Sequence, residues 1–110
     1  MEKDSSPKIL TNLDELLLLV VLRLEGNAYG VTIRRELSTT TGKDWAIGAV
    51  YDPLYRLEQR GLIISSLSHP TQERGGRSKR MFRLTQKGRD ALLAHKNIRD
   101  KLWHVIKETE

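Results

Sequence analysis

The chain has 110 residues, of which 38% are hydrophobic and only 5% aromatic, so we expect one domain with a modest, mostly helical core. It contains no cysteine, which excludes disulfides, thiol catalysis and cysteine-based zinc sites. The formal net charge of +5 is unevenly distributed, because residues 74–89 hold seven lysines or arginines and no acid. Solvated surfaces usually mix their signs, so this stretch indicates a negatively charged partner.

The first helix is expected at about 13–25, after a flexible polar leader at 1–8. Asn12 and Glu15 have the spacing of a capping box at its start. Its apolar run, LLLLVVL, is far too short to cross a bilayer, and it lacks the flanks of a signal peptide, so we expect a cytoplasmic protein. A helix that is apolar on most faces must be covered on two sides, and Leu16 and Leu19 are candidates for contact with a second subunit.

Two further helices are expected before the middle of the chain. The second opens at Tyr29-Gly30 and runs to about Ser38, with a loop over 39–43. The third is predicted at about 48–60, because Val50, Leu54 and Leu57 form one helical stripe. Pro53 disfavours a helix interior, so either it lies in about the first turn or the helix begins later than the stripe suggests.

The hydrophobic period then changes from helical to alternating. LIISSLS at 62–68 and KRMFRLT at 79–85 are candidate strands. The segment between them, 69–78, contains Pro70, Gly75 and Gly76, so the pair is expected to form a hairpin with a long basic tip.

The last helix is expected from Thr85 to about Lys107. It carries more apolar surface than the rest of so small a domain can cover, so we expect it to pair with the same helix of a second copy. The candidate interface residues on this helix are Ala91, His95, Ile98, Leu102, Trp103, Val105 and Ile106.

Three helices followed by a hairpin are the order of a winged helix-turn-helix domain. The predicted fold is therefore mainly α with a small β-hairpin (α+β), with a DNA-binding domain at 9–85 and a C-terminal dimerisation helix at 86–110. In such a domain the third helix enters the major groove and the hairpin, or wing, contacts phosphates.

Two blocks of the sequence resemble the PadR family of bacterial transcriptional regulators. They are GAVYDPLYRLEQRGLI at 48–63 and GGRSKRMFRLTQKG at 75–88, and Tyr29-Gly30 adds to them. The resemblance implies a homodimeric repressor at a pseudo-palindromic operator, often released by a small molecule, with the dimer built from the last and first helices. Ala49 stands where the family often has Ser or Thr, so a hydroxyl contact to DNA is missing, and Ser78 replaces a frequent proline.

The candidate contacts to double-stranded DNA come from the second helix, the loop after it, the third helix and the wing. They are Arg34, Lys43, Ala49, Tyr51, Tyr55, Arg56, Arg74, Arg77, Lys79 and Arg80. Arg56 either reaches DNA or pairs with Glu58 or another acid. Asp52 faces the same way and would repel phosphate unless it accepts a hydrogen bond from a cytosine amine.

Nothing in the sequence indicates catalysis or a cofactor. The three histidines lack metal-ligand spacing, and the acids are scattered among basic residues. Two alternatives stay open beside the repressor: a winged-helix module that binds an acidic protein, and an architectural DNA binder without sequence preference.

Overall fold

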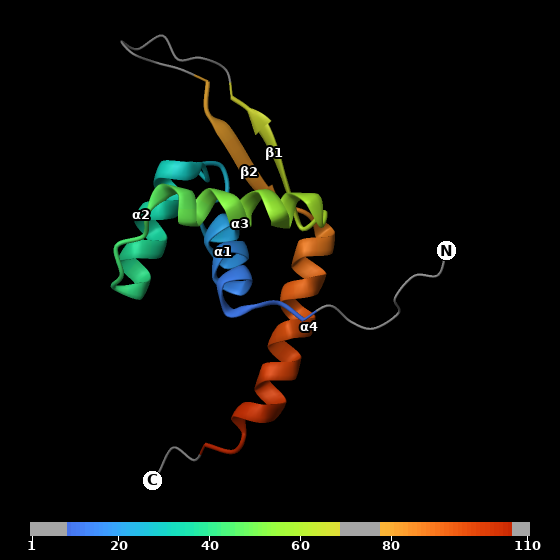
Figure 1. Ribbon diagram of the computed structural model, residues 1–110. Helices are drawn as coiled ribbons and strands as arrows, with labels where there is room; N and C mark the ends of the chain where they lie inside the picture. Colours follow the sequence, from blue (N-terminus) through green and yellow to red (C-terminus); the bar gives the residue numbers. More distant parts are fainter. Residues whose placement is uncertain (1–8, 69–77, 107–110) are drawn as a thin grey trace.

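The computed structural model describes residues 9–68 and 78–106, which form four helices and a two-stranded hairpin (Figure 1). In chain order these are α1 (Asn12–Arg23), α2 (Gly30–Thr41), α3 (Ile47–Gln59), β1 (Ile63–Leu67), β2 (Arg80–Leu84) and α4 (Gln86–Trp103). The predicted α+β fold is confirmed. The predicted leader, most of the predicted wing tip with Arg74 and Arg77, and the last four residues lie outside the described residues.

The core lies between the first three helices and the base of the hairpin. Its largest fully buried side chains are Leu17, Leu18, Val21, Ile33, Leu37, Val50, Leu54, Leu57, Ile63 and Phe82. Every helix except α4 contributes to this set, so the first three helices and the hairpin fold around one cluster. Figure 1 shows α4 leaving this body and extending away from it.

The hairpin is antiparallel, with Ser65 opposite Phe82 and Ile63 opposite Leu84. The strand β2 is also fixed on its other edge, because the Phe82 amide donates to the Ala28 carbonyl oxygen at 2.8 Å. The segment before α2 therefore holds the hairpin against the three helices. Phe82 is fully buried at this junction.

The start of α1 differs from the sequence expectation by one residue. The N-cap is Thr11, whose Oγ1 accepts from the Asp14 amide at 3.0 Å, while Asp14 Oδ2 accepts from the Thr11 amide at 3.3 Å. The proposed box of Asn12 and Glu15 is thus wrong. Glu15 is instead buried against α4.

Three other helix boundaries also differ from the predictions. The helix α1 ends at Arg23 rather than near residue 25. The helix α2 continues to Thr41, so the loop predicted over 39–43 begins only at Gly42, which adopts a φ of 75°. The Thr41 hydroxyl donates to the Leu37 carbonyl oxygen at 2.7 Å and supports the last turn of α2. The helix α4 ends at Trp103 rather than near Lys107.

Pro53 lies inside α3, in its second turn, so both options considered from the sequence were wrong. Proline cannot donate to the carbonyl one turn earlier, that of Ala49. Ala49 is exposed, so water can reach the surroundings of this carbonyl group. The ring of Pro53 is buried in the core. The burial of the ring offsets part of the lost hydrogen bond.

Candidate nucleic-acid interface

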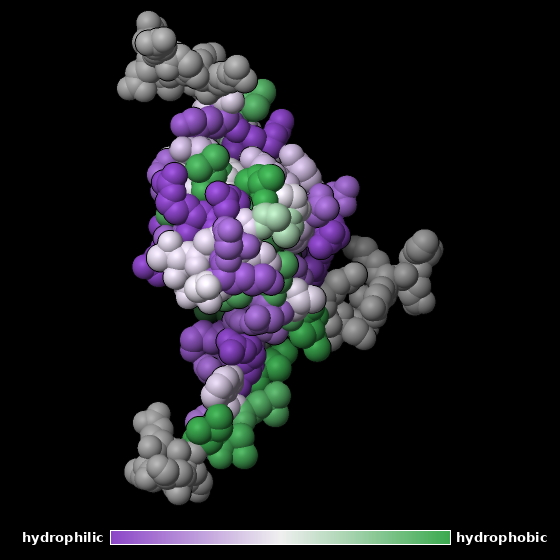
Figure 2. Space-filling view, turned by 60° about the vertical axis from the view of Figure 1, so that its left-hand side comes forward, coloured by the Kyte–Doolittle hydropathy of each residue, from purple (hydrophilic) through white to green (hydrophobic). Residues whose placement is uncertain are grey.

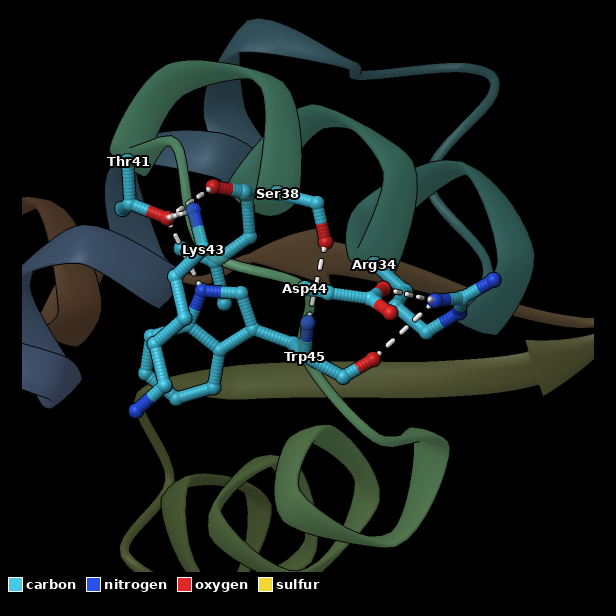
Figure 3. A network of polar contacts seen from close by, with 7 residues as sticks. Arg34, Ser38, Thr41, Lys43, Asp44 and Trp45 are labelled. Atoms are coloured by element: carbon cyan, nitrogen blue, oxygen red, sulfur yellow. Dashed lines mark hydrogen bonds and ion pairs between the residues drawn. The ribbon is translucent and has the colours of Figure 1, made fainter.

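The turn between α2 and α3 is held by a network of polar contacts (Figure 3). Arg34 Nη1 donates to the Trp45 carbonyl oxygen at 3.0 Å and lies 3.5 Å from Asp44 Oδ1. The Trp45 amide donates to Ser38 Oγ at 3.3 Å. The backbone of Trp45 is therefore fixed from both sides, one residue before the N-cap of α3 at Ala46. This fixes where α3 begins relative to α2.

The Trp45 side chain takes part in the same network. Its indole Nε1 donates to Thr41 Oγ1 at 2.9 Å, and its ring packs half-buried against the core. The Lys43 ammonium lies 4.4 Å from the ring centroid, a cation–π geometry. Two predicted DNA contacts, Arg34 and Lys43, thus also support this turn. Trp45 was not singled out from the sequence, although its spacing of four from Thr41 was visible there.

Replacing Trp45 with alanine should lower the free energy of unfolding by about 2 kcal/mol, because a half-buried indole and one hydrogen bond are lost. Chemical denaturation measures this. Lys43→Ala is the matched control and should cost no more than about 0.5 kcal/mol, since it removes one exposed cation–π contact and leaves the indole in place. Equal losses in both variants would contradict the anchoring role of the indole.

The helix α3 has a buried and an exposed face. Pro53, Leu54 and Leu57 point to the core, while Gly48, Asp52, Tyr55 and Gln59 are exposed at spacings of four, three and four. A helix turns by about 100° per residue, so these four residues form one stripe opposite the core. Ala49 and Arg56 are exposed beside it. This stripe is the surface that α3 can offer to a groove.

Tyr51 has a packing role in addition to its position near the exposed face. A Cβ at residue 30 would collide with its hydroxyl group, so glycine at that position lets the ring lie against the start of α2. The Tyr51 and Tyr55 rings stack with centroids 5.9 Å apart and planes inclined by 19°. Tyr55 is the more exposed of the two, and this stack gives its ring a defined position on the stripe.

The base of the wing is tied to the end of α3. Glu58 Oε2 accepts from the Ser65 amide at 3.1 Å and from the Ser65 hydroxyl at 2.7 Å. Arg80 Nη1 donates to the same hydroxyl oxygen at 3.0 Å. Among the residues described, Arg56 has no ion-pair partner, so the pairing with Glu58 considered from the sequence is not formed.

Lys79 connects the wing to the start of α2. Its ammonium lies 4.3 Å from the Tyr29 ring centroid and 3.3 Å from the Tyr29 hydroxyl oxygen. The neighbouring Arg80 is also exposed. The described cations of the wing are therefore Lys79, just before strand β2, and Arg80 and Arg83 on this strand.

The contact between α1 and α4 contains a buried acid. Glu15 accepts from Arg99 Nη1 at 3.2 Å through both carboxylate oxygens, and His95 Nε2 lies 3.8 Å from Glu15 Oε1. His95, predicted on the dimer stripe, is buried within its own chain. Farther along α4, a hydrogen bond from Lys96 lowers the pKa of the exposed Asp100 carboxyl below its usual value.

The far half of α4 and the residues that follow it expose a row of apolar side chains. Leu102 is 72% exposed, Trp103 54% and Val105 78%, and these three line a shallow hollow together with Ile106. Ile98 and Leu19 are also exposed, whereas Leu16 and Ala91 pack partly against the core. Figure 2 shows hydrophobic residues along one side of the extending α4. Leu93 is also 57% exposed, and it was not singled out from the sequence.

In the described parts of the chain, no group of His, Cys, Asp or Glu residues is arranged to hold a metal ion. No described helix is long and apolar enough to cross a membrane.

A three-helix core, a helix with an exposed stripe and a hairpin beside it define the winged helix-turn-helix class of transcriptional regulators. The model of the PadR-like transcriptional regulator family matches residues 18–94, which is well over half of the chain. The protein belongs to this family, whose members are transcriptional regulators and not enzymes. No curated protein sequence matches the chain.

Solved structures with the same fold come from several bacteria. A PadR family transcription regulator from hypervirulent Clostridium difficile R20291 is 29% identical, with a TM-score of 0.65 over 86% of this chain and 94% of that one. A PadR-like transcriptional regulator from Bacillus cereus is 20% identical, with a TM-score of 0.70 over 84% and 85%. A Streptococcus transcriptional regulator is 23% identical, with a TM-score of 0.67 over 84% and 85%.

Proposed function

We propose that this regulator is a homodimeric repressor that binds a pseudo-palindromic DNA operator. The observation that carries the proposal is the exposed stripe of α3, held at a fixed angle by the Trp45 network and joined to the basic wing through Glu58 and Ser65. In this arrangement α3 lies in the major groove and the wing follows the phosphates. Because the ligand is chromosomal DNA, we place the protein in the cytoplasm.

The second subunit is proposed to pack on the exposed apolar row of α4 and the residues just after it. Water-exposed Leu102, Trp103 and Val105 are costly to leave uncovered, and a twin helix supplies a surface of the same chemistry. Two-fold symmetry then separates the two α3 helices by about one turn of DNA, near 34 Å. A small-molecule effector would change the angle between the paired α4 helices. This would alter the separation of the two α3 helices and release the DNA.

Selection of bound duplexes from a random library of about 30 base pairs, at roughly physiological salt, tests the proposal. Enrichment of an inverted repeat with half-sites one helical turn apart is the expected result. Binding without enrichment would favour an architectural DNA binder. Absence of binding, with capture of an acidic protein instead, would favour the protein-interaction module.

Lys79→Ala should weaken binding to all duplexes alike. If Lys79 neutralises one phosphate, the slope of log affinity against log salt should fall by about one. Titrations of the operator and a random duplex at several salt concentrations measure this. Lys101→Ala on α4, which removes the same charge far from the wing, is the control and should leave the slope unchanged. A loss confined to one operator position would contradict the phosphate contact.

A further inference from the structure

Asp52 is an acid on the surface proposed to enter the groove. It lies on the exposed stripe of α3, one turn after Gly48, and it makes no ion pair with any other described residue. The other acid of this helix, Glu58, is held by Ser65. Asp52 therefore presents a carboxylate without an ion-pair partner among the described residues, and the neighbouring charge on this surface is that of Arg56.

A carboxylate at this place weakens binding to any DNA, because it repels phosphates at all sequences alike. It is compatible with tight binding only where the DNA offers a hydrogen-bond donor that compensates the repulsion. An arginine is available one turn later, at i+4, but the two side chains do not pair in the structure. The carboxylate is thus left available to an outside partner.

Gly48 leaves open space beside this carboxylate. A Cβ at residue 48 would meet no atom within 4 Å, and its φ does not lie in the left-handed region. Neither packing nor backbone conformation requires glycine there, although glycine destabilises a helix relative to alanine. The missing side chain creates a gap at residue 48, on the same stripe as Asp52, through which a base edge can approach.

The chemistry of the major groove selects the partner. An ionised carboxylate can only accept hydrogen bonds, and the donors in that groove are the N4 amine of cytosine and the N6 amine of adenine. Adenine places its N7 acceptor beside its amine, where it would repel a carboxylate, whereas cytosine does not. We propose that Asp52 reads the N4 amine of a cytosine in each half-site and that Gly48 gives this base the clearance to reach it. The inference rests on the proposed DNA-binding function.

Duplex selection with the full-length wild type and its variants tests the inference. Wild type should enrich a cytosine at one position of each half-site. Asp52→Ala should lose about tenfold in discrimination at that position alone, and Asp52→Asn should shift its preference toward adenine, whose N6 and N7 suit an amide. Gly48→Ala should weaken operator binding while leaving thermal stability equal or higher.

Glu25→Gln is the charge-matched control, because Glu25 is an exposed acid in the loop after α1. If Asp52→Asn and Glu25→Gln raise affinity for operator and random duplexes by the same factor, with every positional preference unchanged, Asp52 only repels DNA and the inference is overturned. In that case the enriched operator leaves the proposed function standing. A wild-type protein that enriches no sequence overturns the proposed function together with the inference.

Discussion

Replacing Gly88 with alanine is expected to lower the free energy of unfolding by about 3 kcal/mol, because the added methyl group has no room. A Cβ at this position would collide with the Leu62 carbonyl oxygen, and it would lie 2.8 Å from Leu84 Cδ1. Part of this obstacle is backbone and cannot rotate away. The helix α4 would have to shift from the base of the hairpin, where the Thr85 hydroxyl donates to the Gly61 carbonyl oxygen at 2.7 Å.

Gly48→Ala is the matched control for this substitution. Both glycines lie in the first turn of a helix, but the position of a Cβ at residue 48 is open. Alanine there should stabilise the protein by up to about 1 kcal/mol, the usual helix preference of alanine over glycine. Urea unfolding of both variants measures the difference. Equal midpoints would show that α4 does not pack closely on Leu62.

The hydrophobic stripes were enough to predict the order of elements and most of the core. Val50, Leu54 and Leu57 were expected on one face of the third helix, and they are buried there. The alternation around Phe82 likewise predicted a strand, and the structure has one there with Phe82 buried. These features are local, because the period of apolar residues follows directly from helix or strand geometry.

Features that depend on distant contacts were not predictable in the same way. Thr11 and Asn12 are both good N-caps, and each is followed three residues later by an acid. The choice depends on Glu15, which is buried and paired with Arg99, a residue far along the chain. The role of Trp45 likewise depends on how α2 and α3 are placed relative to each other. Local pattern contains no information on the Glu15–Arg99 pair or on the contacts of the Trp45 backbone with Arg34 and Ser38.

The proposed dimer gives the prediction with the largest effect on assembly. Leu102→Glu should raise the dimer dissociation constant by about 100-fold, or about 2.7 kcal/mol, because two carboxylates would meet in an apolar seam. The side chain is 72% exposed in one chain, so the stability of the monomer should change by no more than about 0.5 kcal/mol. Sedimentation equilibrium over a range of concentrations measures the dissociation constant.

The same variant should bind operator DNA much more weakly. In a dimer, binding of one recognition helix holds the second at a high effective concentration near its half-site, and this gain is lost when the subunits separate. Asn97→Glu is the matched control, since it adds the same charge at an exposed position of α4 outside the apolar row. It should stay dimeric and keep its affinity. A Leu102→Glu protein that remains dimeric would show that the two chains pair through another surface, and the 34 Å separation of the α3 helices would then need another origin.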